Sequence, residues 1–153
     1  MWSATLPISN NVRHPLGENL CNSDFLRRYA RRLLRNARSL EPSQSLPVLR
    51  RIVAAEITPE LRITEVYSVR TTLQLKHILH MLARELGFGA WELCKKQIDQ
   101  CAPEMLDRYR FDLGMFNDYQ QNWFADADTA KAWQKENGGY LVNVGKQVVA
   151  ILA

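Results

Sequence analysis

The pattern of hydrophobic and polar positions first predicts a long amphipathic helix over residues 23–40. Apolar residues recur there at intervals of four and three, the spacing of one helix face. They are Leu26, Ala30, Leu33, Ala37 and Leu40. Ser23 stands at the expected N-cap, and Asp24 suits the positive end of the helix dipole. We therefore expect the apolar face to be buried.

The polar side of this helix is predicted to carry a face of arginines. At 100° per residue, six arginines lie opposite or beside the apolar stripe: Arg27, Arg28, Arg31, Arg32, Arg35 and Arg38. Only Asp24 opposes their charges within the helix. A run of charge is usually a solvated helix face, but this one is lopsided enough to favour a binding surface.

Two further segments follow with weaker signals. A second helix is predicted to begin at residue 46 and to end near residue 56, with Ser45 as its N-cap and Pro47 in its first turn. Residues 57–69 fit a strand no worse than a helix. The sequence leaves that choice open.

A strong helical period returns over residues 72–86. Gly87 is placed to end this helix as a C′ glycine. A fourth helix is predicted from residue 90 to about residue 100, before Pro103. The two helices would form a hairpin.

The last third of the chain changes to a strand-rich pattern. It predicts a strand, a helix and two strands in that order, over residues 119–124, 127–136, 140–144 and 147–152. Asp126 would cap the helix, and Gly145-Lys146 is a two-residue hairpin signal. Trp123 and Trp133 are expected to be core aromatics.

These elements predict an α+β protein. A chain of 153 residues is long enough for one domain with its own core. We expect residues 21–153 to form a single α+β domain, with a helical part at 23–102 and a β-α-β-β part at 115–153. Residues 1–20 are expected to be an extended arm, because they contain prolines and asparagines without a sustained period.

Composition restricts the class of protein further. The net charge is +4, and the basic excess lies entirely in the first 70 residues, where eleven arginines face six acids. No apolar run is long enough to cross a bilayer, and the N-terminus does not resemble a signal peptide. We therefore expect a cytoplasmic protein whose three cysteines are free thiols: Cys21, Cys94 and Cys101.

Residues 75–91 carry a recognisable motif, with the sequence LKHILHMLARELGFGAW. This segment resembles a small bacterial helical module with the hallmark A-R-E-[YL]-G-F-x-x-W, which occurs near ankyrin-repeat and glyoxalase-like proteins. Residues 30–34, Ala-Arg-Arg-Leu-Leu, are similar to what precedes that hallmark. The resemblance covers residues 23–100 and implies a helical scaffold. The residues themselves agree with a structural role, in which Gly87 ends the first helix, Phe88 fills the hairpin and Trp91 packs the second helix onto the first. The resemblance implies no enzymatic activity.

A helix-turn-helix at residues 79–98 is the main alternative. Four residues fit the packing of a DNA-reading hairpin: Ala83, Leu86, Gly87 and Leu93. Against it, Lys96 stands where an apolar residue is expected, and Trp91 and Glu92 are poor partners for phosphates or bases. Lys95 and Lys96 would be the cations of such a site.

Catalytic and metal chemistry have little support. His77 and His80 are three residues apart, and Cys94 or Glu85 would have to complete a site, but no third ligand or orienting group is identifiable. We predict no catalytic residue, no metal and no cofactor. An enzyme of unrecognised type is the weakest hypothesis for the function.

The predicted function is that of a non-enzymatic interaction or regulatory protein. It would bind a protein partner through the arginine-rich helix face, and nucleic acid is the alternative partner. The candidate binding residues are Arg27, Arg28, Arg31, Arg32, Arg35, Arg38, Lys95 and Lys96.

Overall fold

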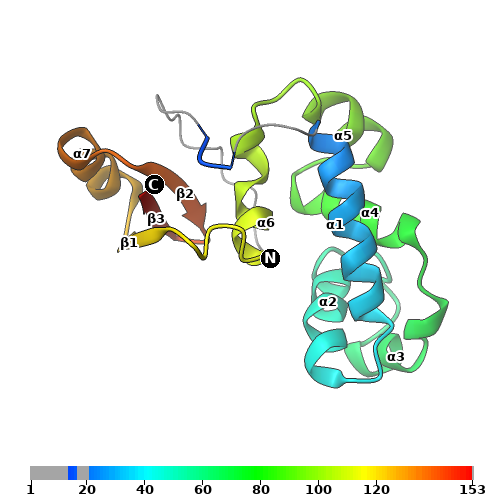
Figure 1. The fold of residues 1–153 in the computed structure, drawn as a ribbon. Helices are drawn as coiled ribbons and strands as arrows, with labels where there is room; N and C mark the ends of the chain where they lie inside the picture. Colours follow the sequence, from blue (N-terminus) through cyan, green and yellow to red (C-terminus); the bar gives the residue numbers. More distant parts are fainter. Residues whose placement is uncertain (1–13, 17–20, 153) are drawn as a thin grey trace. The chain divides into compact units, whose positions relative to one another are not determined.

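A computed structural model describes residues 14–16 and 21–152 of the chain, and it confirms the α+β class (Figure 1). Two compact units can be distinguished in it. The helical unit consists of residues 22–100. The sheet unit consists of residues 101–152, together with Cys21 and the described residues 14–16. Each unit is described by itself below. No described helix has both the length and the apolar character needed to cross a bilayer.

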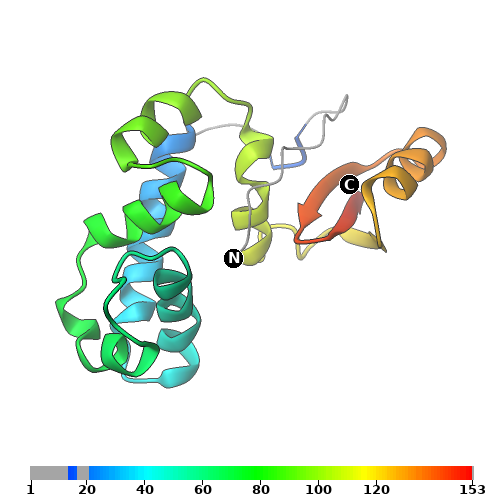
Figure 2. The ribbon, with the colours of Figure 1, turned by 180° about the vertical axis from the view of Figure 1, so that it is seen from behind.

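The helical unit is built around its first helix, which packs against α2, α4 and α5. Its elements are α1 (Asn22–Ala37), α2 (Pro42–Ala54), α3 (Ile63–Ser68), a 3₁₀ turn (Arg70–Thr72), α4 (Leu75–Glu85) and α5 (Trp91–Ile98). In both views α2 and α3 lie at one end of the unit and α5 at the other (Figures 1 and 2). The predicted apolar stripe of α1 is buried as far as Ala37.

The prediction for α1 is wrong at both ends. The helix begins at Asn22, so Ser23 lies in its first turn and is not its N-cap. Ser23 instead donates its backbone N–H and its hydroxyl to the two carboxylate oxygens of Asp99, both at 2.8 Å. The helix ends at Ala37, and Leu40 beyond it is 81% exposed rather than part of the stripe.

The predicted start of α2 is also wrong. The helix begins at Pro42, with Glu41 as the N-cap residue, because Pro at the first helical position needs no N–H partner. Ser45 is therefore inside the helix, where its hydroxyl donates to the Glu41 carbonyl at 3.3 Å. Pro47 also lies inside the helix rather than in its first turn.

In the ambiguous segment at residues 57–69, Ile63–Ser68 form the helix α3, and no strand forms there. The hairpin of α4 and α5 is confirmed. Gly87 follows α4 with φ of +90°, a conformation that glycine adopts without a Cβ penalty. The helix predicted from residue 90 to about residue 100 is slightly shorter, since α5 begins at Trp91, with Ala90 as its N-cap residue, and ends at Ile98.

The sheet unit contains the predicted β-α-β-β element. Its elements are a 3₁₀ turn (Pro103–Leu106), α6 (Asp107–Asp112), β1 (Gln120–Phe124), α7 (Ala127–Asn137), β2 (Tyr140–Val144) and β3 (Gln147–Leu152). The strands are antiparallel in the order β1-β3-β2. Asp126 caps α7 by accepting the Thr129 N–H at 2.7 Å, and Gly145 has a φ of +65° in the hairpin turn.

Alternating residues of β2 and β3 pack on the two faces of this sheet. One face packs against α7 through Leu141, Val148 and Ala150, and the other contributes Tyr140, Val142, Val149 and Ile151 to a cluster around Phe116. Trp133 packs against the first cluster, although it is only half-buried. The core prediction for Trp123 is wrong, since its side chain is 46% exposed and contacts Phe111 edge to face.

Candidate functional site: an arginine surface on the first helix

Four of the six predicted arginines form a free cationic surface on α1. They are Arg28, Arg31, Arg32 and Arg35. All four are exposed, and within residues 14–16 and 21–152 they make no hydrogen bond or ion pair. Their spacing of three and four residues places them along one helix face. We call these four residues the arginine surface.

The other two arginines contact neighbouring elements. Arg27 pairs with Asp24, with Nη1 3.2 Å from Oδ1, and its guanidinium carbon lies 5.9 Å from the centre of the Trp91 ring. Arg38 donates from Nε to the Leu73 carbonyl at 3.0 Å. These contacts tie α1 to α5 and to the segment before α4. We therefore assign Arg27 and Arg38 to the scaffold.

The arginine surface borders a hollow. An open depression of about 560 Å³ is lined by Arg28, Arg31, Leu34, Arg35 and Leu75. Leu34 belongs to α1 and Leu75 is the first residue of α4, and both are half-buried. The hollow therefore offers three guanidinium groups beside two aliphatic side chains. Guanidinium groups bind carboxylates through paired N–H donors.

The charge of the helical unit agrees with an acidic ligand. Residues 22–100 contain fourteen basic and eight acidic side chains, a net charge of +6, whereas residues 101–152 have five and seven, a net charge of −2. Like charges three or four residues apart destabilise a helix, so the arginine surface opposes helix stability.

The helical hairpin does not keep the packing expected of a DNA-reading motif. Leu93, expected to pack inward, is 57% exposed, and the buried residues of α5 are Cys94 and Ile98. Lys95 is half-buried and Lys96 is exposed, and neither makes a hydrogen bond or ion pair within the described chain. The inner face of α5 is therefore rotated from the one that the helix-turn-helix frame requires.

His77 has a structural contact instead of a ligand. Its Nδ1 accepts the Gln74 backbone N–H at 2.9 Å, at the N-terminus of α4. Partial burial and the nearby charge of Lys76 lower the pKa of His77 below its ordinary value. Cys94 is fully buried. Within residues 14–16 and 21–152, no three His, Cys, Asp or Glu side chains are grouped so that they could hold a metal ion.

The sheet unit contains a buried polar cluster that the sequence did not reveal. Asp107 lies at its centre: Oδ1 is 2.7 Å from His14 Nε2 and 3.0 Å from Arg110 Nη1, and Oδ2 accepts the Tyr140 hydroxyl at 2.5 Å. Because His14 Nδ1 accepts the Leu16 N–H at 3.2 Å, the ring proton lies on Nε2. All four cluster side chains are buried, so the cluster lies inside the unit and offers no open site.

No local sequence signal identifies this cluster, since His14 and Asp107 are 93 residues apart. His14 nevertheless lies within the segment predicted to be an extended arm, and it is only 6% exposed. Residues 1–13 and 17–20 of that arm lie outside the described residues.

Comparison of the chain with known protein families, with curated proteins and with solved structures finds no match. The resemblance of residues 75–91 to the bacterial helical module therefore stays an expectation. The candidate site consequently depends on its own geometry and charge.

Proposed function

We propose that this chain is a non-enzymatic interaction protein that binds an acidic segment of a protein partner through the arginine surface of α1. The observation that carries this proposal is the hollow in which Arg28, Arg31 and Arg35 stand beside Leu34 and Leu75. A partner segment with carboxylates and one aliphatic or aromatic side chain matches both parts of this lining. Arginine is also among the residues most enriched in interface hot spots.

A protein partner fits the hollow better than a nucleic-acid backbone does. Phosphate contacts need cations and N–H donors, and they gain nothing from aliphatic side chains within the same hollow. The exposed Leu93 further separates α5 from the packing of a recognition hairpin. DNA binding is therefore the alternative that the same experiment has to test.

The decisive test compares two variants with equal changes of charge. In the first, Arg28, Arg31 and Arg35 are each replaced by Glu. In the second, three other cations without ion pairs in the described chain, Lys95, Lys96 and Lys131, are replaced by Glu. We expect cross-linking and purification from the native host to recover a protein with the wild type and the second variant, and to lose it with the first.

Two results would contradict the proposal. One is recovery of the same protein with the Arg28, Arg31 and Arg35 variant at wild-type yield, provided that its melting curve shows an intact fold. The other is tight binding of mixed-sequence duplex DNA that falls by orders of magnitude between about 50 and 200 mM salt and is lost in that variant. The second result would replace the protein partner with DNA.

A further inference from the structure

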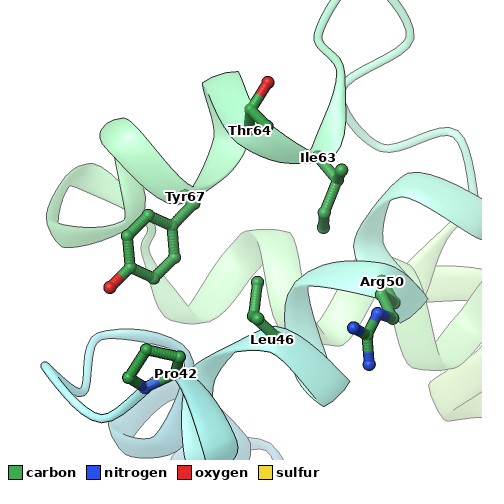
Figure 3. A pocket seen from close by; sticks show the side chains of 6 residues that line it. All are labelled: Pro42, Leu46, Arg50, Ile63, Thr64 and Tyr67. Atoms are coloured by element: carbon green, nitrogen blue, oxygen red, sulfur yellow. The ribbon is translucent and has the colours of Figure 1, made fainter.

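A second surface of the helical unit lies between α2 and α3. It is an open groove of about 440 Å³, lined by Pro42, Leu46, Arg50, Ile63, Thr64 and Tyr67 (Figure 3). Leu46 and Ile63 lie at the middle of the groove, with Tyr67 and Pro42 toward one end and Arg50 toward the other (Figure 3). Pro42, Leu46 and Arg50 are four residues apart, so this side of the groove extends about 12 Å along α2.

Two exposed apolar residues lie close in sequence to residues that line the groove. Leu40 is 81% exposed and lies two residues before Pro42. Val69 is 40% exposed and lies two residues after Tyr67. Arg70 joins their two segments by donating from Nε to the Ser39 carbonyl at 3.0 Å. Each end of this Arg70 contact therefore lies beside an exposed apolar residue and within three residues of a position that lines the groove.

The same arginine fixes the end of the groove. Arg70 also donates from Nη1 to the Tyr67 carbonyl at 2.8 Å, and its guanidinium carbon lies 4.2 Å from the centre of the Tyr67 ring. These contacts restrict the Tyr67 side chain before any ligand binds. A groove with fixed walls loses less conformational entropy on binding than a flexible one.

The other end of the groove is cationic. Among the described residues that line it, Arg50 alone carries a charge. Its side chain is exposed, and in the described part of the chain it makes no hydrogen bond or ion pair. An apolar groove that ends at an unpaired guanidinium group matches an apolar ligand with a carboxylate at one end.

We infer that this groove docks an amphipathic helical segment of a partner protein. A length of about 12 Å corresponds to eight residues, or about two turns, of such a helix. Aliphatic or aromatic residues of the segment pack on Leu46, Ile63 and Tyr67, and an Asp or Glu at one end pairs with Arg50. The exposed Leu40 and Val69, each two residues from a lining residue, favour a protein segment over a small molecule, because a small ligand would leave them uncovered.

The test uses a displayed library of random dodecapeptides, panned against the purified full chain. Counter-selection uses Thr64→Trp, in which an indole at an exposed position obstructs the groove. We expect enrichment of peptides with apolar residues three or four apart and an acidic residue about one turn further. A synthetic peptide of this family should bind Arg50→Glu and Thr64→Trp at least about tenfold more weakly than the wild type.

A matched control separates this inference from the proposed function. The variant with Arg28, Arg31 and Arg35 replaced by Glu leaves the groove unchanged, so it should bind the synthetic peptide within about twofold of the wild type. Melting curves establish that every variant is folded.

Three outcomes would overturn the inference. The first is that panning yields no peptide family that Thr64→Trp fails to bind. The second is that the enriched peptides lack acidic residues and that Arg50→Glu binds them as tightly as the wild type does. The third is that sedimentation velocity shows a dimer that Thr64→Trp abolishes, which would make a second copy of the chain the occupant of the groove.

Discussion

Arg51 and Glu85 form a two-pronged ion pair between α2 and α4, with Nη2 2.6 Å from Oε1 and Nε 2.8 Å from Oε2. Arg51 Nη1 also donates to the Tyr29 hydroxyl of α1 at 2.9 Å, so one guanidinium group joins three helices. Burial alone would lower the pKa of Arg51, but the bonds and charges of Glu85 and Tyr29 outweigh burial and raise that pKa. Arg51 therefore keeps its positive charge beside Glu85.

Glu85→Ala is expected to lower the free energy of unfolding by about 3 kcal/mol, because it leaves a largely buried guanidinium group without its anion. Urea denaturation at neutral pH measures this loss. The double variant Arg51→Met, Glu85→Leu should lose less than the sum of the two single variants, since it leaves neither charge unpaired. A Glu85→Ala protein as stable as the wild type would refute this account of the pair.

Tyr140 should make stability fall at alkaline pH. Burial, followed by the charge of Asp107, raises the pKa of Tyr140 above its ordinary value of 10.0. The folded state therefore keeps a proton that the unfolded state releases above pH 10, and unfolding becomes easier as pH rises further. For each proton that the folded state keeps and the unfolded state releases, the free energy of unfolding falls by about 1.4 kcal/mol per pH unit.

Denaturant unfolding between pH 8 and 11 tests this dependence. Tyr140→Phe should remove its share of the slope, because Phe has no proton to release. At neutral pH the same variant should cost about 1–3 kcal/mol, since Asp107 Oδ2 loses a buried donor. Equal slopes in the wild type and Tyr140→Phe would show that the tyrosine ionises normally in the folded protein.

Asp99 should stabilise the start of α1 from a distance. Its carboxylate accepts two hydrogen bonds from Ser23, so Asp99→Ala removes the acceptor for an N-terminal backbone N–H of α1. We expect a loss of about 1 kcal/mol, similar to the removal of an N-cap. Asp99→Asn keeps one carbonyl oxygen and should lose less. Hydrogen exchange at the Ser23 amide should accelerate in Asp99→Ala, and an unchanged rate would contradict the assignment.

Arg31→Gln should stabilise the protein while it weakens partner binding. Arg31 lies three or four residues from Arg27, Arg28 and Arg35, so its removal relieves like-charge repulsion worth a few tenths of a kcal/mol. Added salt should stabilise the wild type more than this variant, because salt screens the same repulsion. Thermal melts at two salt concentrations measure both effects. A destabilised Arg31→Gln protein would indicate a structural role for this arginine.

His77 should titrate below 6.5, because partial burial and the charge of Lys76 lower its pKa. Protonation would remove the lone pair that accepts the Gln74 N–H. The contribution of His77 to stability is therefore present above pH 6.5 and is lost as pH falls through the lower pKa of the folded state. NMR titration of the ring measures the midpoint. Lys76→Gln should move it upward, and a wild-type midpoint above 6.5 would contradict the assignment.

The sequence predicts elements whose signals are local. The β-α-β-β order follows from alternating strands, and Asp126 is close enough to Thr129 for the cap of α7 to be recognised. The start of α1 was misplaced because Ser23 is bonded to Asp99, a residue 76 positions away. The helix α3 has only six residues, too few for a period to distinguish it from a strand.

The sequence predicts the residue type of the candidate site, but it does not predict which of the six arginines form it. Helical spacing placed all six arginines on the polar side of the helix predicted over residues 23–40. Which of them are free depends on Trp91 and Leu73, which contact Arg27 and Arg38 from distant parts of the sequence. The hollow also needs Leu75 from α4, and no periodicity within α1 indicates that residue.

The bonds between α1 and the end of α5 have a consequence for the order of folding. Asn22 Nδ2 donates to the Ile98 carbonyl at 2.8 Å, and Ser23 binds Asp99, so the two ends of the helical unit meet. The contact between His14 and Asp107 closes a loop of 93 residues in an unfolded chain. Once the helical unit has folded, that loop is shortened to the two short connections 14–22 and 98–107, and its closure costs less entropy. The helical unit is inserted within the sequence of the sheet unit, and its folding thus lowers the entropic barrier to folding of the sheet unit.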